Sequence, residues 1–259
     1  HDAIPRAIKI KNTLLLSSGS HGKYLGRIDL KVDNGKVVDF SSNVIPIFSD
    51  VIQPDPEMTR LIDKIRKPYE EECNRVVGEA ETLLYRRGNF GGPWDSVICD
   101  AIIQERDTEI SLSPGFRWGT TLLPGQKITI DDIYSQTSMN YPEVYRTEMN
   151  GETIKNLLED VCDNIFNPDP FFQQGGDMVR VGGMTYTCQP KETMGKRISD
   201  LKLSNGEKIE SQKKYTIGGW GSINPDVKGP PIYKLLEDYV SGEKIIKPKH
   251  NNPVTIKGI

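Results

Sequence analysis

The sequence lacks several features that mark specialised classes of protein. Its 33 lysines and arginines do not outnumber its 36 acidic residues, and the net charge is −3. Duplex binding usually needs a basic face, so nucleic acid is not expected as a main partner. No apolar run approaches the length that crosses a membrane. We therefore expect neither a nucleic-acid partner nor a membrane partner.

Paired metal-binding or redox cysteines are also lacking. The four cysteines form no CxxC pair and show no zinc-ligand spacing. Cys99 and Cys162 lie in apolar helical patterns, which predicts buried thiols rather than catalytic ones. Histidine is scarce: His21 lies in a glycine-rich turn, where a structural or exposed role is expected, and His250 is expected to be solvated.

The chain has no start methionine and no signal peptide, and it begins His-Asp-Ala-Ile-Pro. We expect a piece of a longer protein, whose targeting information lies elsewhere. Its 259 residues suffice for one large domain or two small ones. Hydrophobic residues make up 36% and charged residues 27%, which suits a globular protein.

Strand and helix patterns alternate irregularly, which favours an α+β fold with a mixed sheet. Period-two alternation on both sides of Asp33-Asn34-Gly35 predicts a hairpin over 26–40. Asp55 precedes a proline and an apolar stripe, which predicts a capped helix over 56–76. Further helices are predicted at 94–105, 151–166 and 230–240, and strands at 13–17, 79–84, 108–112, 127–130, 144–149, 178–181, 197–203 and 214–218.

Two turns rich in glycine, arginine and aromatic residues are the main functional signal. Residues 85–95 read Tyr-Arg-Arg-Gly-Asn-Phe-Gly-Gly-Pro-Trp-Asp, and residues 113–119 read Ser-Pro-Gly-Phe-Arg-Trp-Gly. Guanidinium groups bind oxyanions bidentately, glycines let backbone N–H groups approach a ligand, and a helix N-terminus adds positive potential. The pair therefore predicts one pocket for an anionic substrate. The alternative is that the arginines form surface ion pairs and the glycines only turn the chain.

The order of these motifs resembles that of the 5′-nucleotidase family. The matching stretches are Gly-Lys-Tyr-Leu-Gly-Arg, Arg-Arg-Gly-Asn-Phe-Gly, Ile-Cys-Asp-Ala-Ile, Pro-Gly-Phe-Arg, Pro-Gly-Gln-Lys-Ile-Thr-Ile-Asp-Asp and Met-Asn-Gly-Glu-Thr-Ile-Lys-Asn-Leu-Leu-Glu. The stretches Arg-Gly-Asn-Phe-Gly-Gly-Pro-Trp-Asp and Gln-Gln-Gly-Gly-Asp-Met-Val-Arg-Val-Gly-Gly resemble its SoxB branch, the dimanganese thiosulfohydrolases of bacterial sulfur oxidation.

The resemblance implies a division of the chain into three parts. Residues 1–50 would be the strand-rich end of a metallophosphoesterase domain, 51–77 a linker with an interdomain helix, and 78–259 a substrate-binding domain of the 5′-nucleotidase C-terminal type. The intact enzyme would hold two Mn²⁺ or Zn²⁺ ions. His1 would be one retained metal ligand, and no catalytic residue is expected in this chain. We therefore expect no bound metal and no activity in the isolated piece.

The resemblance also implies a set of substrate-binding residues. Arg86 and Arg117 match the family's anion-binding arginines, Arg87 is the neighbour of the SoxB type, and Asn89 belongs to the same turn. Trp220 lies near the place of a base-stacking phenylalanine in nucleotidases.

Other residues are candidates for the same pocket. Arg180 adds a further charge, either in the pocket or in a surface ion pair, and Trp94 and Trp118 fit either the pocket or the core. The Gly-Gly-Asp-Gly-Phe motif of nucleotidases is missing after Trp220. Near the place of their first aromatic clamp no phenylalanine is present, although Tyr141 could substitute. These departures favour a carrier peptide over a nucleotide.

The resulting hypothesis is the substrate-binding portion of a periplasmic SoxB-like hydrolase. Such an enzyme releases sulfate from a cysteine S-thiosulfonate on a SoxYZ-type sulfur carrier protein. One alternative is a domain of a 5′-nucleotidase or 2′,3′-cyclic phosphodiesterase. Another is an inactive module that binds an anion or a partner protein.

Overall fold

The chain divides into two structural units, His1–Tyr69 and Glu70–Ile259. The structure is a computed structural model that describes residues 3–20, 22–116, 119–138, 140–222, 224, 226–249 and 253–258. The three-part division predicted from the sequence, with boundaries at 50 and 77, stays a prediction.

The first unit consists of two small antiparallel sheets and a helix. Strands β1 (Ile8–Ile10) and β2 (Thr13–Leu15) pair with each other, as do β3 (Tyr24–Asp33) and β4 (Lys36–Pro46). The hairpin turn predicted at Asn34-Gly35 is present. Both residues have positive φ, +47° and +74°, as a type I′ turn requires. The strands are longer than predicted, because their pairing continues as far as Tyr24 and Pro46.

Helix α1 (Pro56–Arg66) begins where the sequence predicts and ends early. The Asp55 carboxylate accepts hydrogen bonds from the backbone N–H groups of Glu57 and Met58 at 2.9 and 2.8 Å. The predicted helix over 56–76 is broken into α1, the 3₁₀ turn η1 (Lys67–Tyr69) and the short α2 (Glu70–Cys73). Pro68 explains the break, since it lacks a backbone donor and crowds the preceding turn.

The second unit contains three sheets of mixed or antiparallel pairing, which confirms the α+β prediction. The central sheet has the order β8-β12-β6-β9, with β6 and β12 parallel and the outer pairs antiparallel. The other two have the orders β13-β5-β7 and β11-β10-β14. Their strands are β5 (Val76–Ala80), β6 (Ile110–Ser113), β7 (Lys127–Thr129), β8 (Tyr145–Asn150), β9 (Arg180–Gly182), β10 (Met184–Cys188), β11 (Ile198–Leu203), β12 (Lys214–Gly219), β13 (Ile245–Ile246) and β14 (Val254–Ile256).

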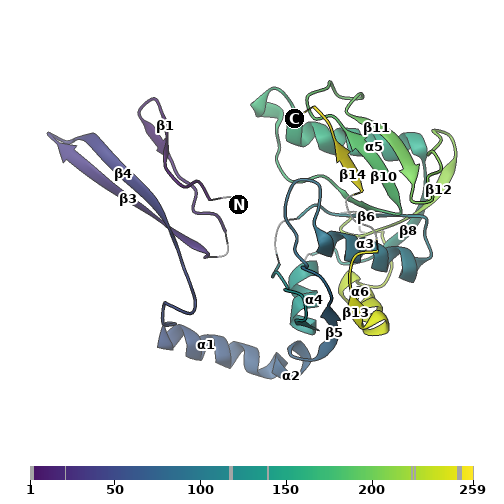
Figure 1. The fold of residues 1–259 in the computed structure, drawn as a ribbon, viewed down its shortest axis with the longest axis horizontal. Coiled ribbons are helices and arrows are strands. Elements are labelled where there is room, and N and C mark those ends of the chain that lie inside the picture. Colours follow the sequence, from purple (N-terminus) through teal and green to yellow (C-terminus); the bar gives the residue numbers. More distant parts are fainter. Residues whose placement is uncertain are drawn as a thin grey trace. The chain divides into compact units, whose positions relative to one another are not determined.

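Four helices cover these sheets and create two apolar cores (Figure 1). They are α3 (Pro93–Arg106), α4 (Ile130–Thr137), α5 (Gly151–Phe166) and α6 (Ile232–Glu243), with a 3₁₀ turn η2 (Pro170–Phe172) after α5. One core joins α3, α4 and α6 to the sheet of β5. The other joins α5 to the sheets of β6 and β10. Residues between these cores, at the start of α3, form the candidate site.

The helix predictions at 94–105, 151–166 and 230–240 correspond to α3, α5 and α6. The sequence reading missed α4, β10 and β14. Cys99 and Cys162 are buried, as predicted from their apolar patterns.

Candidate functional site

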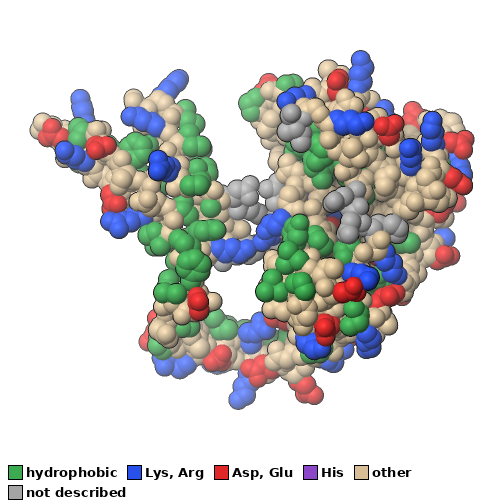
Figure 2. All heavy atoms as spheres, in the orientation of Figure 1, with side chains coloured by type: hydrophobic (Ala, Val, Ile, Leu, Met, Phe, Trp, Pro, Cys, Tyr) green, Lys and Arg blue, Asp and Glu red, His purple; other side chains and the backbone are tan. Residues whose placement is uncertain are grey.

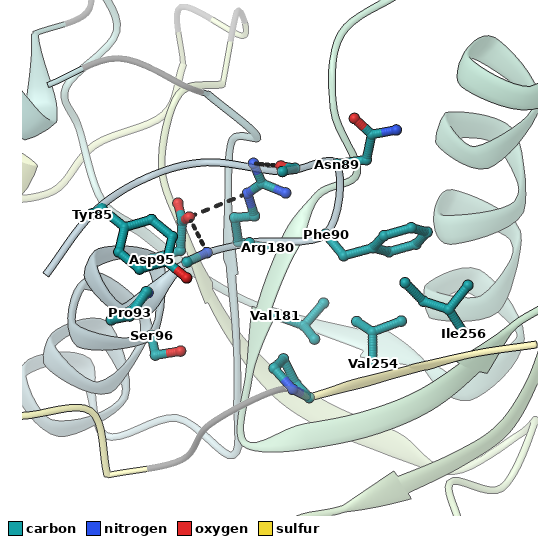
Figure 3. A pocket seen from close by; sticks show the side chains of 14 residues that line it. Tyr85, Asn89, Phe90, Pro93, Asp95, Ser96, Arg180, Val181, Val254 and Ile256 are labelled. Atoms are coloured by element: carbon teal, nitrogen blue, oxygen red, sulfur yellow. Dashed lines mark hydrogen bonds and ion pairs between the residues drawn. The ribbon is translucent and has the colours of Figure 1, made fainter. Parts of the chain in front are cut away.

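A cavity of about 750 Å³ lies beside the first glycine-rich turn of the second unit. Its walls come from the loop 85–92, the first turn of α3, strand β9 and the edge strand β14 (Figure 3). One side of the cavity is apolar and is formed by Val181, Val254 and Ile256. The other side is polar and is formed by Asn89, Asp95 and Arg180. A ligand with a charged group at one end and an apolar or extended chain at the other would match these two sides.

The loop above the cavity depends on its glycines. Gly88 and Gly91 have φ values of +78° and +135°, which L side chains rarely adopt. A Cβ on Gly92 would lie 2.3 Å from the carbonyl oxygen of Tyr85, so the chain closes on itself too tightly for any side chain. The Asp95 carboxylate accepts a hydrogen bond from the Gly92 N–H at 2.9 Å and so fixes the loop onto the start of α3.

Two buried arginines meet at that same carboxylate. Arg86 Nε lies 2.7 Å from Asp95 Oδ1, and Arg180 Nε lies 3.5 Å from Asp95 Oδ2. Arg180 Nη2 also lies 3.2 Å from Asp177 Oδ2. All four side chains are at least 96% buried. Two positive and two negative charges thus balance one another in a place where an unpaired charge would be costly.

Arg180 is the cation that faces the cavity. Figure 3 shows its side chain rising from β9 beneath the glycine-rich loop, with Asp95 on one side and Asn89 and Phe90 on the other. Its Nη2 donates to the carbonyl oxygen of Gly88 at 3.0 Å. Within the described part of the chain, its Nε and Nη1 make no hydrogen bond. Burial lowers the pKa of Arg180, although Asp95 and Asp177 oppose the shift.

Arg86 is not among the residues that line the cavity. Its Nε binds Asp95, its Nη1 donates to the carbonyl oxygen of Gln136 at 2.7 Å, and its Nη2 donates to that of Pro114 at 3.0 Å. These bonds tie the loop, α3 and α4 together, so the structure gives Arg86 a structural role. The anion-binding role predicted for it stays a prediction.

The remaining predicted residues occupy different places. Arg87 is half-buried, and its Nη1 donates to the carbonyl oxygen of Arg86 at 2.7 Å. Asn89 does line the cavity, and its backbone oxygen accepts from the Met178 N–H. Trp220 is 3% exposed, packs in the core, and its Nε1 donates to Ser113 Oγ at 2.8 Å. The indole is therefore not placed to stack on a ligand.

Several predicted residues lie outside the described part of the chain. They are His1, Arg117, Trp118, His21 and His250. Of the other candidate residues, Trp94 is fully buried in the core and Tyr141 is 44% exposed. The described residues contain no group of three or more His, Cys, Asp or Glu side chains that could hold a metal ion. No helix among them is long and apolar enough to cross a membrane.

A second cavity of about 800 Å³ adjoins the first through Asn89 and Phe90. The Phe90 ring stacks on Phe166 of α5, with ring centroids 6.0 Å apart and an interplanar angle of 13°. The sequence reading missed this aromatic pair and the contacts of Arg180 with the first loop. The first arginine turn gave a usable signal for the cavity, whereas no described residue of the second turn lines it. No local pattern links Phe90 to Phe166.

A family model for the 5′-nucleotidase C-terminal domain matches residues 76–221. The structure of sulfate thiohydrolase SoxB from Thermus thermophilus in complex with glycerol has a TM-score of 0.93 and 30% identity, over all of this chain and 49% of that one. A 5′-nucleotidase precursor of Thermus thermophilus has a TM-score of 0.78 and 14% identity, over 98% of this chain and 54% of that one, which shows the fold alone.

Among curated proteins, the endonuclease YhcR of Bacillus subtilis is 24% identical over 90% of this chain. The trifunctional nucleotide phosphoesterase protein YfkN of the same organism is 24% identical over 76%. The chain spans 19% and 14% of these two relatives and about half of the two solved structures.

Proposed function

The chain belongs to the 5′-nucleotidase C-terminal domain family, and on that premise we propose that it is the substrate-binding portion of a SoxB-like hydrolase. The intact enzyme releases sulfate from a cysteine S-thiosulfonate carried by a SoxYZ-type protein in the periplasm. The observation that carries the proposal is the match to SoxB over the entire chain, at 30% identity and a TM-score of 0.93.

The chemistry of the cavity supports this proposal. A sulfonate presents oxyanions, and a buried guanidinium with an unused N–H is a donor that such an oxygen can satisfy. Arg180 supplies that donor within the described residues, and Asn89 stands beside it. The apolar wall of Val254 and Ile256 leaves room for the peptide that carries the sulfonate.

A nucleotide is a poorer fit to the described residues. Base recognition in this family would need an accessible aromatic at the place of Trp220, and that indole is buried against Ser113. The nuclease and nucleotide phosphoesterase among the curated relatives nevertheless make phosphate ester hydrolysis the second candidate. The two candidates differ in the product that they release.

In this proposal, the metal site of the intact enzyme is formed by residues other than those that the structure describes. Two Mn²⁺ or Zn²⁺ ions would activate a water and polarise the group under attack. No cluster of side chains in the described residues fits such ions, so we derive no step through them. The role of this chain is to bind and orient the anion.

Product analysis of the full-length enzyme tests the proposal. With Mn²⁺, we expect sulfate release from a carrier bearing a cysteine S-thiosulfonate, and little phosphate release from AMP or 2′,3′-cyclic AMP. Rapid phosphate release without sulfate release would establish the phosphoesterase instead. Hydrolysis by the isolated chain at the rate of the full-length enzyme would contradict its assignment as a binding portion only.

A substitution at Arg180 tests the cavity itself. Arg180→Lys keeps a positive charge but loses the planar fork, so kcat/KM for sulfate release should fall at least about tenfold. Arg146→Lys is the matched control, because Arg146 is exposed and binds the carbonyl oxygens of Arg106 and Asp107. An unchanged kcat/KM in a folded Arg180→Lys enzyme would remove Arg180 from the binding site.

A further inference from the structure

Two buried cysteines from different elements face each other in the second core. Cys162 belongs to α5 and Cys188 ends β10, and both side chains are fully buried. Their sulfur atoms lie 3.5 Å apart, although 26 positions separate the residues in the sequence. We propose that Cys162 and Cys188 are a modification site, at which an external disulfide donor converts the two thiols into a disulfide between α5 and β10.

The surroundings of the pair favour closure to a bond. A disulfide needs its sulfurs about 2.0 Å apart, so the observed contact of 3.5 Å must shorten by a side-chain rotation or a small shift of the backbone. Leu158 and Ile198 belong to the same apolar core and keep α5 packed against the sheet of β10 and β11. Figure 1 shows α5 next to these strands. The fold therefore holds the two sulfurs face to face.

The exchange proceeds in two steps through a mixed disulfide. One of the two cysteines, as its thiolate, attacks the donor disulfide and releases the first donor thiol. The other cysteine then loses its proton, attacks the mixed disulfide and releases the second donor thiol. Two cysteine thiols are oxidised and one donor disulfide is reduced to two thiols.

Other roles for this pair are poorly supported. A metal would need further ligands, and the described residues offer no cluster of three. Among the four cysteines, all of which the structure describes, only Cys162 and Cys188 have their sulfur atoms in contact, so the fold brings no other pair together. Because both sulfurs are inaccessible in the folded state, the donor reaches them while the domain folds. The inference does not depend on the proposed function.

Refolding in a redox buffer tests the inference. The reduced, unfolded protein is refolded with oxidised and reduced glutathione, unfolded again without reductant, and labelled with N-ethylmaleimide. Peptide mapping by mass spectrometry should find Cys162 linked to Cys188 and the label only on Cys73 and Cys99. A chain labelled at all four cysteines, or one whose disulfide includes Cys73 or Cys99, would overturn the proposal.

Thermal unfolding provides a second measurement. The bond links residues 26 positions apart and so restricts the unfolded chain. The Tm of the oxidised protein should therefore exceed that of the reduced protein by about 5 °C or more. Cys73→Ser should keep the difference, because Cys73 is outside the pair, whereas Cys188→Ala should abolish it. If Cys188→Ala does not fold, the comparison of oxidised and reduced Tm in the wild type and in Cys73→Ser still tests the bond. Equal Tm values for their oxidised and reduced forms would count against the bond.

Discussion

Asp95 joins Arg86, which the motifs predict to bind the anion, and Arg180, for which the sequence leaves open a pocket charge or a surface ion pair. Its Oδ1 accepts from Arg86, while its Oδ2 accepts from the Gly92 N–H and faces Arg180. One carboxylate thus shapes the glycine-rich loop and holds two buried positive charges. The sequence shows the arginines and the aspartate, but not which arginine the fold turns toward the cavity.

Removal of the Arg86 charge should destabilise the second unit. Arg86→Met removes one of the two positive charges beside the Asp95 carboxylate and removes the hydrogen-bond donor of two carbonyl oxygens. The free energy of unfolding should therefore fall by about 3–5 kcal/mol. Urea denaturation measures the change. Arg75→Met is the control, because the pair of Arg75 with Glu237 is half-exposed at the arginine and its loss should destabilise the unit far less. Equal losses in the two variants would contradict the structural role of Arg86.

The ion pair of Asp163 and Arg197 should make stability depend on pH. Their atoms Oδ1 and Nη1 lie 2.5 Å apart, and the hydrogen bond from Arg197 lowers the pKa of Asp163. A lowered carboxyl pKa adds stability above the ordinary value of about 3.9, and this stability is lost as the pH falls through the folded-state pKa. Asp163→Asn should therefore unfold more easily than wild type at pH 7.

Urea unfolding at several pH values measures this difference. The gap between Asp163→Asn and wild type should narrow steadily below about pH 4, where the carboxylate becomes protonated. Asp238→Asn serves as the control, since Asp238 is 53% exposed and binds Lys234 at the surface. A gap that stays constant from pH 7 to strongly acidic conditions would show that the Asp163 charge contributes nothing.

At the scale of elements, local signals located some parts of the fold and missed others. The type I′ hairpin and helix α5 follow from turn residues and apolar periodicity that lie within a few positions of each other. Strand β14 has only three residues and forms because β10 pairs with it from some 70 positions away. Such pairing, like the stacking of Phe90 on Phe166, arises from tertiary contacts that no local pattern encodes.

Helix α4 carries a start signal that the sequence reading did not use. Thr129 Oγ1 accepts from the Asp132 N–H, and the Asp132 carboxylate accepts from the Thr129 N–H. This is a capping box with aspartate in place of glutamate. Thr129→Ala should reduce the free energy of unfolding by about 1 kcal/mol, as urea denaturation would measure. Thr121→Ala, at an exposed loop position, should change the free energy of unfolding little. If the two variants lost the same amount of stability, the capping role of Thr129 would be contradicted.

At the scale of the whole molecule, the two units differ in what holds them together. Both apolar cores belong to the second unit, while none of the described residues of the first unit is buried. Many apolar side chains of β3, β4 and α1 are exposed instead, and Figure 2 shows such side chains at the surface. A two-stranded hairpin without a covered face is marginally stable in water.

Hydrogen exchange should therefore separate the two units. In the isolated chain, amides of β3 and β4 should exchange several orders of magnitude faster than those of β6 and β12, because opening free energies range from near zero up to the global value. In the full-length enzyme, the same hairpin amides should become protected, since SoxB and the nucleotidase share this part of the fold within chains of about twice the length. Mass spectrometry of exchanged peptides measures both states. Equal protection of β3 and β6 in the isolated chain would mean that the first unit holds its strands without an apolar core.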